Sequence, residues 1–116
     1  MNIEACYNKM GADYAEVKSR LPSDAFIKRF ALKFLDDPTF ALLEKSLAEE
    51  NVDEAFRAAH TLKGITQNLG FSQLSPLAIE ITELLRQGTM DGTDTLFPQL
   101  KEKYDMTVSC IKEIDE

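Results

Sequence analysis

Residues 51–70 have the sequence NVDEAFRAAHTLKGITQNLG, in which signals for both ends of a helix enclose an apolar pattern. The side chain of Asn51 can accept a hydrogen bond from the free backbone amides of the next turn, and Glu54 can reach back to the Asn51 amide. At the other end, Gly70 can adopt the left-handed conformation that closes a helix, and Phe71 can return an apolar contact to the last turn. The stretch therefore predicts a helix from Asn51 to Gly70.

One side of this helix is apolar, and the opposite side carries the single histidine of the sequence. Apolar and small residues recur at steps of three and four, which is the period of a helix that buries one face. These residues are Ala55, Ala58, Ala59, Leu62, Ile65, Thr66 and Leu69. At about 100° per residue, His60 lies about 160° from the centre of this stripe, so the pattern predicts that its imidazole faces solvent. This geometry argues against a core histidine and leaves an incidental surface histidine as the alternative.

The predicted neighbours of His60 lie three, four or seven residues away and share its face. They are Asp53, Phe56, Arg57, Lys63, Gly64 and Gln67. Gly64 costs a helix about 1 kcal/mol relative to alanine, which favours a need for open space beside the imidazole; the alternative is that a glycine is tolerated there. Lys63 is the candidate cation for an anionic ligand. Arg57 could add to this attraction, and its alternative is a surface ion pair with a carboxylate one turn earlier.

Helical periodicity also covers the rest of the chain, and no segment shows the alternation expected of a strand. We predict further helices over residues 2–10, 13–21 and 23–35, from 37 to the connection at 49–51, from a serine cap to 87, and from 97 to 114. The serine cap is either Ser72 or Ser75, and the second would place Pro76 at the first helical position. We interpret residues 89–95 as a polar turn and place Pro98 near the start of the last helix.

These elements predict an all-α fold, an antiparallel four-helix bundle with one or two short extra helices at the N-terminus. A chain of 116 residues has the size of a single domain, so we expect residues 1–116 to form one. The aromatic and methionine stripes are interpreted as core and are assigned no cofactor.

The composition argues against several classes of function. A formal charge of −7 disfavours nucleic acid as a partner, because its phosphates would be repelled. No apolar run approaches the ~20 residues that cross a membrane, and no signal peptide is visible, so we expect a cytoplasmic protein. Cys6 and Cys110 lack metal-ligand spacing and are expected to be buried thiols, with a disulfide between the two end helices as the alternative.

The motif around the histidine resembles a known family. The run Ala58-Ala59-His60-Thr61-Leu62-Lys63-Gly64, followed by Asn68-Leu69-Gly70-Phe71 and by Leu74, Leu77 and Ala78, resembles the histidine-containing phosphotransfer (HPt) domains of multistep phosphorelays. The resemblance extends over essentially the whole chain. It implies that His60 accepts a phosphoryl group from a phosphoaspartate on one response-regulator receiver domain and passes it to the aspartate of another. The partners implied are receiver domains and a hybrid histidine kinase, with Mg²⁺ held by the receiver and no cofactor on this chain, which we expect to be a monomer.

Each residue of the motif then has an expected role. A neutral imidazole can attack phosphorus with its free ring nitrogen, Lys63 would stabilise the phosphoryl charge, and Gly64 would allow access. The residues expected to contact the receiver or the phosphate are Phe56, Arg57 and Gln67. In the resembled family, a glutamine from the following helix orients the histidine ring. Thr82 stands at that position here, and its shorter side chain is the candidate for this role.

Other chemistries fit the sequence less well. One histidine without a Glu-x-x-His pair cannot build the carboxylate-bridged metal centre of a helical bundle, and no glycine-rich phosphate loop is present. We therefore expect a phosphocarrier without a metal site or a kinase module. The alternatives are a helical module that docks receiver domains without carrying phosphate, and direct phosphorylation of His60 by a histidine kinase.

Overall fold

The computed structural model describes residues 1–115, and in that part of the chain the secondary structure is entirely helical. The helices are α1 (Ile3–Lys9), α2 (Tyr14–Arg20), α3 (Asp24–Phe34), α4 (Thr39–Ala48), α5 (Val52–Asn68), α6 (Ser75–Arg86) and α7 (Thr93–Lys112). The prediction of an all-α fold is confirmed.

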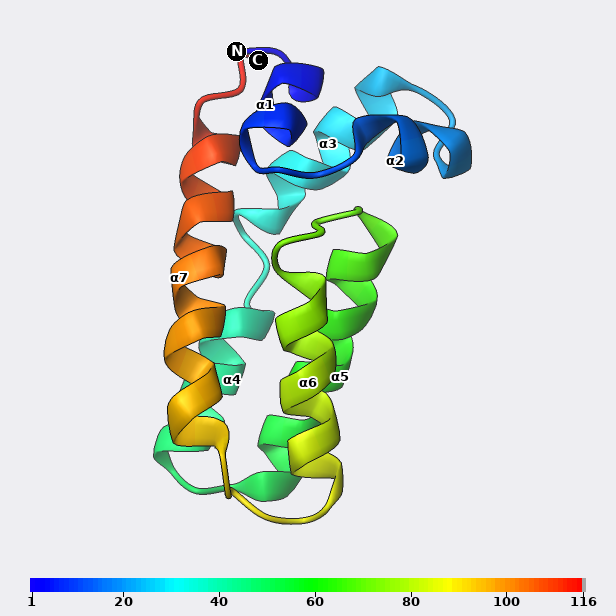
Figure 1. Cartoon of the computed structure of the whole chain (residues 1–116). Helices are drawn as coiled ribbons and strands as arrows, with labels where there is room; N and C mark the ends of the chain where they lie inside the picture. Colours follow the sequence, from blue (N-terminus) through cyan, green and yellow to red (C-terminus); the bar gives the residue numbers. More distant parts are fainter. Residues whose placement is uncertain (116) are drawn as a thin grey trace.

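Helices α4, α5, α6 and α7 form the predicted antiparallel bundle (Figure 1). Helix α5 packs against α4 on one side and α6 on the other, and α6 in turn packs against α7. The short helices α1 and α2 and the longer α3 lie at one end, where α7 extends beyond the other bundle helices to meet α1 and α3. The two chain termini lie together at this end, and the amino group of Met1 is 2.6 Å from a carboxylate oxygen of Asp115.

Helix α5 begins as its capping signal predicts, with one difference. The Asn51 side chain accepts a hydrogen bond from the Glu54 amide at 3.1 Å. The return bond of a full capping box is replaced, because the Asn51 amide donates to the Ser46 carbonyl and the Glu54 carboxylate pairs with Arg57. The start of α5 is therefore fixed both by its own cap and by the end of α4.

The carboxyl end of α5 is closed by Gly70, which has a φ of +69°. The Phe71 amide donates to the Thr66 carbonyl and the Gly70 amide to the Gln67 carbonyl, the pair of bonds that defines a Schellman motif. Phe71 is 2% exposed and packs against the rings of Tyr7 and Phe34. A Cβ atom built on Gly70 would lie 2.0 Å from a methyl carbon of Val17 in α2. Glycine is required here both by the backbone angle and by the approach of α2.

Two side chains from the N-terminal helices bind the same end of α5. The hydroxyl of Tyr7 donates to the Leu69 carbonyl at 2.6 Å in a buried contact. The guanidinium of Arg20 donates to the carbonyls of Gln67 and Asn68, each at 3.2 Å. Carbonyl groups in the last turn of a helix lack partners within the helix, and a cation there also opposes the negative end of the helix dipole. Helices α1 and α2 therefore hold the end of the helix that carries His60.

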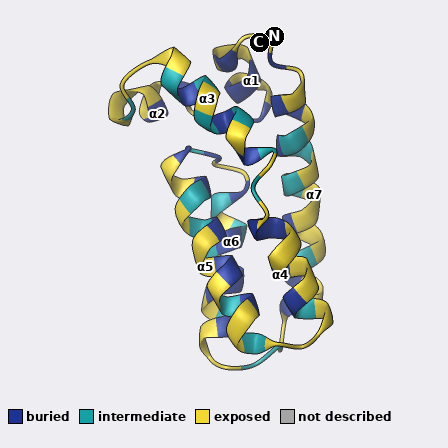
Figure 2. Cartoon of the chain, turned by 180° about the vertical axis from the view of Figure 1, so that it is seen from behind, coloured by how far each residue is buried: buried dark blue, intermediate teal, exposed yellow. Residues whose placement is uncertain are grey.

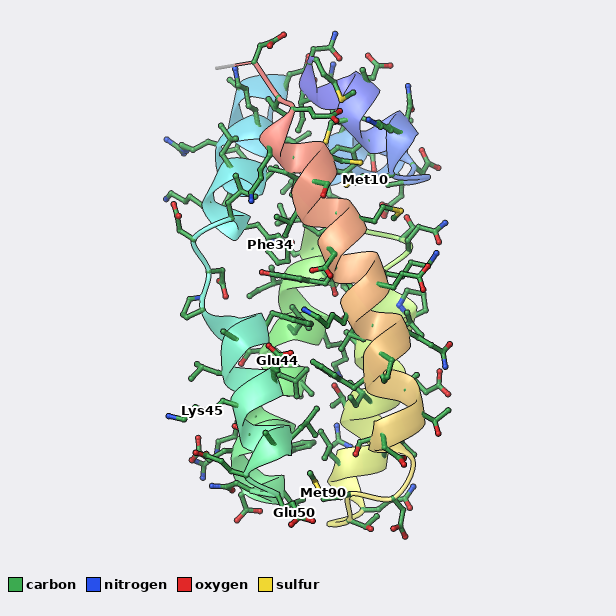
Figure 3. The ribbon with its side chains drawn as sticks, turned by 90° about the vertical axis from the view of Figure 1, so that its left-hand side faces the viewer. Met10, Phe34, Glu44, Lys45, Glu50 and Met90 are labelled. Carbon is green, nitrogen blue, oxygen red and sulfur yellow. The ribbon has the colours of Figure 1, made fainter. Side chains whose placement is uncertain are left out.

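A row of aromatic rings runs through the core from the N-terminal helices into the bundle. Successive ring centroids are between 3.8 and 5.8 Å apart. The row consists of Tyr14, Tyr7, Phe71, Phe34, Tyr104, Phe40 and Phe97. Figure 3 shows Phe34 in the upper half of the molecule, a little below Met10 and far from Met90 at the lower end. Contacts at these distances stabilise a core beyond the area that they bury, so the row joins both ends of the molecule into one core.

The buried polar groups of the core are satisfied locally. Thr66, Thr82 and Thr107 are at most 1% exposed, and each hydroxyl donates to the carbonyl four residues earlier in its own helix. Cys6 and Cys110 are buried free thiols and do not form the alternative disulfide. Burial, with a smaller contribution from Cys110, raises the pKa of the Cys6 thiol to about 11, so this thiol is held in its unreactive neutral form.

Three predicted helix starts differ from the structure. Helix α4 starts at Thr39 with Pro38 at the N-cap position, and the Asp37 carboxylate before it accepts a hydrogen bond from the Thr39 amide at 2.8 Å. Neither serine caps α6, because Leu74 occupies the N-cap position and Ser75 is already helical. The last helix starts at Thr93 after Gly92, four residues earlier than predicted, because a glycine in the left-handed region turns the chain directly into α7. Propensity alone did not locate these boundaries, which depend on the connecting backbone.

The approach of α2 to Gly70 can be tested by Gly70→Ala. We expect a loss of about 3 kcal/mol or more in the free energy of unfolding, because a left-handed alanine costs about 1–2 kcal/mol and overpacking against Val17 adds a similar amount. Urea unfolding followed by circular dichroism measures the loss.

Gly88→Ala is the matched control, since Gly88 has a φ of +80° and a Cβ there would meet no atom within 4 Å. It should lose only the conformational part, about 1–2 kcal/mol. Equal losses in the two variants would contradict the close packing of α2 on α5.

Candidate functional site

The two faces of α5 divide as the sequence predicts. The buried side consists of Ala55, Ala58, Ala59, Leu62, Thr66 and Leu69, while Ile65 is half-buried. His60 is exposed on the opposite side. Seen from behind the view of Figure 1, α5 shows a largely exposed outer surface (Figure 2). Three alanines on the buried side let α5 lie close to its neighbours, which fixes the position of the backbone that carries the imidazole.

Gly64 and Lys63 both lie within one turn of His60 on α5. Gly64 is exposed, and a Cβ built on it would meet no atom within 4 Å, so the surface beside the histidine is open. Lys63 is half-buried, which places the aliphatic part of its side chain against the helix surface. No carboxylate in residues 1–115 forms a salt bridge with Lys63. Its ammonium group is therefore available to an anionic ligand or partner.

Phe56, one turn before His60, is the side chain that contacts the imidazole. The two ring centroids are 5.9 Å apart with an interplanar angle of 41°. The guanidinium carbon of Arg86, in the last turn of α6, lies 5.1 Å from the centroid of the Phe56 ring. Arg86 is in turn paired with Glu83 at 3.0 Å. A row of contacts thus leads from α6 across Phe56 to His60.

Arg57 and Gln67 are less closely tied to the site. Arg57 is paired with Glu54 at 3.4 Å, and its side chain is 75% exposed. The surface ion pair that the sequence offered as the alternative for Arg57 is therefore present. Pairing does not exclude a contact with a partner, because an exposed pair contributes little and breaks readily. Gln67 is exposed, and its main-chain carbonyl accepts a hydrogen bond from Arg20.

Thr82, the candidate for orienting the imidazole, is bonded within its own helix. Its side chain is fully buried, and its hydroxyl donates to the Ala78 carbonyl at 2.6 Å. The single donor of the hydroxyl is therefore used inside α6, and none of the hydrogen bonds of residues 1–115 joins Thr82 to His60. A threonine can satisfy its hydroxyl on its own helix in this way, and a role for Thr82 in orienting the ring stays a prediction.

A groove of about 200 Å³ lies between α4 and α5 next to this surface. Its lining consists of Thr39, Leu42, Ser46, Glu54, Arg57, Ala58 and Thr61. Leu42 is 52% exposed, the large hydrophobic side chain that stands out from the surface of residues 1–115. The groove shares Arg57 and Thr61 with the exposed part of α5, which also carries His60 and Lys63.

Sequence reasoning did not identify Arg86 and Arg20. Arg86 ends α6 opposite the start of α5, so antiparallel pairing of these helices could have pointed to it. Arg20 had no such signal, because its carbonyl partners lie 47 and 48 residues away. Within the described residues, no group of three or more histidine, cysteine or carboxylate side chains could hold a metal ion. None of the helices in this part of the chain has the length and apolar character needed to cross a membrane.

Comparisons with known proteins agree with this geometry. Residues 37–109 match the model of the family described as Hpt domain. Chemotaxis protein CheA of Halobacterium salinarum is 41% identical over 69 residues, an alignment that covers 57% of this chain and 10% of that protein. The chain therefore corresponds to about a tenth of the length of this relative. No match was found among the solved structures.

The family match begins just before α4 and ends in the last turn of α7, so it covers nearly all of the four-helix bundle and well over half of the chain. It includes all of α5, which carries the exposed histidine. The chain belongs to the Hpt domain family.

Proposed function

We propose that this protein is a phosphorelay intermediate in which His60 carries the phosphoryl group between receiver domains. The observation that supports this most directly is the position of His60, which is exposed at the middle of a helix fixed at both ends, beside the open surface at Gly64. Membership of the Hpt domain family supports the same chemistry.

The proposed reaction needs only one nucleophile on this chain. A ring nitrogen of neutral His60 attacks the phosphorus of an aspartyl phosphate, forming an N–P bond while the P–O bond to the aspartate breaks. The aspartate leaves as a carboxylate, assisted by the Mg²⁺ that the receiver holds. Transfer to a second receiver reverses these steps with a new aspartate. Because phosphoryl transfer depends mainly on alignment and charge stabilisation, a rigid helix with one nearby cation is sufficient on the carrier side.

Lys63 is the cation that we assign to the transferring phosphoryl group. It lies within one turn of His60 and forms no salt bridge in residues 1–115, whereas Arg57 is already paired with Glu54. Arg57 and Gln67 are proposed as outer contacts with the receiver. Gly64 would allow the receiver backbone to approach the imidazole.

We place the phosphoryl donor outside residues 1–116. Residues 1–116 contain no glycine-rich phosphate-binding loop, so we propose that they form one carrier domain without a kinase activity of its own. The proposed donors are receiver domains, including that of a hybrid histidine kinase, and the proposed setting is the cytoplasm. A monomer is favoured because one face would have to serve two partners in turn.

The second candidate is a module that docks receivers without carrying phosphate. The exposed Leu42 beside the groove between α4 and α5 favours it, because an apolar side chain next to a concave surface is typical of a protein interface. The two candidates differ in the role that they give to His60.

His60→Gln separates these candidates. Glutamine keeps a neutral polar side chain but lacks the nucleophilic ring nitrogen, so radiolabel from a phosphorylated receiver should reach wild type and not the variant. Acid-labile labelling on gels measures the transfer. Equal labelling of both proteins would exclude His60 as the acceptor, while receiver binding without labelling of either would favour the docking module.

Lys63→Ala should slow transfer about tenfold, because a charge-assisted contact worth about 1.4 kcal/mol in the transition state is lost. Rapid-quench kinetics at saturating receiver measure the rate, and the melting temperature should change little. Lys112→Ala makes the same charge change in the last turn of α7 and should leave the rate unaltered. An unchanged rate for Lys63→Ala would remove Lys63 from the site.

Gly64→Ala should stabilise the protein and impair its transfer. The free energy of unfolding should rise by about 1 kcal/mol, since alanine is the better helix former and its methyl group meets nothing within this chain. Transfer should slow about tenfold or more if the receiver packs against this position.

Ser109→Ala is the control, because Ser109 is an exposed helical position on α7 where alanine also favours the helix. It should alter stability slightly and leave transfer unaffected. A Gly64→Ala variant that is stabilised but transfers at the normal rate would show that access does not explain this glycine.

A further inference from the structure

The imidazole of His60 is held by an aromatic contact and by no hydrogen bond within residues 1–115. The separation of 5.9 Å from the Phe56 ring falls within the range of favourable tilted aromatic pairs, 4.5–7 Å. An exposed histidine otherwise rotates freely about both of its side-chain bonds. Phe56 therefore restricts the orientations available to the ring.

Phe56 has its own support on the opposite side. Its half-buried ring lies under the guanidinium of Arg86, 5.1 Å from the ring centroid. Arg86 is paired with Glu83 on α6, and its Nε atom lies 3.0 Å from a carboxylate oxygen. Cation–π contacts of this kind contribute about 0.5–1 kcal/mol at exposed sites, enough to favour one position of the ring. The last turn of α6 thereby determines where Phe56 lies.

Thr82, the polar side chain of α6 considered for this role, is committed to the Ala78 carbonyl. The aromatic contact acts on the imidazole without a hydrogen bond. A contact through the ring leaves both ring nitrogens of His60 free, including the one whose lone pair attacks phosphorus.

We infer that Phe56 is a positioning residue, which orients the His60 imidazole for phosphoryl transfer, and that Arg86, held by Glu83, fixes Phe56 in turn. This inference rests on the proposed function. Phe56 thus acts on the reaction through His60 and does so in the free protein, before any receiver is bound.

The kinetic test measures two quantities for each variant: the transfer rate at saturating receiver, and the receiver concentration that gives half of that rate. Phe56→Leu keeps an apolar side chain without the ring and should lower the saturating rate about tenfold, with the half-saturating concentration unchanged within about twofold. Phe56→Tyr keeps the ring and should restore the rate. Arg86→Gln should lower it about threefold and Arg86→Lys less.

Arg29→Gln is the matched control, because Arg29 lies over Phe26 and Phe30 in the same kind of contact, on a helix that carries neither His60 nor Phe56. It should not alter the transfer. A rise in the half-saturating concentration for Phe56→Leu at an unchanged saturating rate would overturn the inference, because it would make Phe56 a contact for the receiver.

A spectroscopic test needs no phosphate. The ring-current field of Phe56 should displace the carbon-bound proton signals of the His60 imidazole in the NMR spectrum of the free protein. Phe56→Leu should return these signals to the positions of an unstructured histidine, and Arg86→Gln should move them part of the way. Unmoved signals in Phe56→Leu would overturn the inference whatever the kinetics. If no receiver labels the wild type, the proposed function fails, and the NMR result still decides whether Phe56 orients the ring.

Discussion

The carboxyl end of α5 is bound by groups that lie far from it in sequence, and the position of His60 depends on this attachment. Gly70 turns the backbone in the left-handed region, Val17 packs directly against it, and the hydroxyl of Tyr7 and the guanidinium of Arg20 bind the last carbonyls of the helix. The other end of α5 is fixed by Asn51. A helix held at both ends frays little, so the residues in its middle keep one orientation relative to the bundle.

The packing beneath the site extends this rigidity through the molecule. Alanines on the buried side of α5 keep it close to α4 and α6, and the aromatic row from Tyr14 to Phe97 connects the bundle to the N-terminal helices. A phosphocarrier gains from such support because the transfer depends on alignment more than on acid or base chemistry. The open surface at Gly64 is then a local exception in a well-packed molecule, on the side of α5 that faces away from the core.

Local signals in the sequence predicted the helices, the two faces of α5 and the exposure of His60, because each depends on residues only three or four positions apart. The groups that bind the end of α5 could not be predicted in the same way, since Tyr7 and Arg20 act across 62 and about 48 residues. The same limit applies to the site. The role expected for Thr82 came from its position in the motif, whereas the structure shows its hydroxyl bonded within its own helix. One turn later on α6, Arg86 lies over the ring of Phe56, which lies beside His60. These contacts depend on which helices pack together, and the periodicity of a single sequence carries no information on that.

The buried threonines of α5, α6 and α7 have a consequence for how the bundle assembles. Thr66, Thr82 and Thr107 each satisfy their hydroxyl on their own helix, and no buried side-chain polar atom in residues 1–115 lacks a partner. Helices α4 to α7 therefore meet through surfaces on which the buried polar atoms are all satisfied. In the described residues, no hydrogen bond or salt bridge joins the side chains of two of these four helices, so none specifies which turn of one lies opposite which turn of the next. Registration along the helix axes is left to the shapes of the apolar side chains, with the fixed ends of α5 as the reference points.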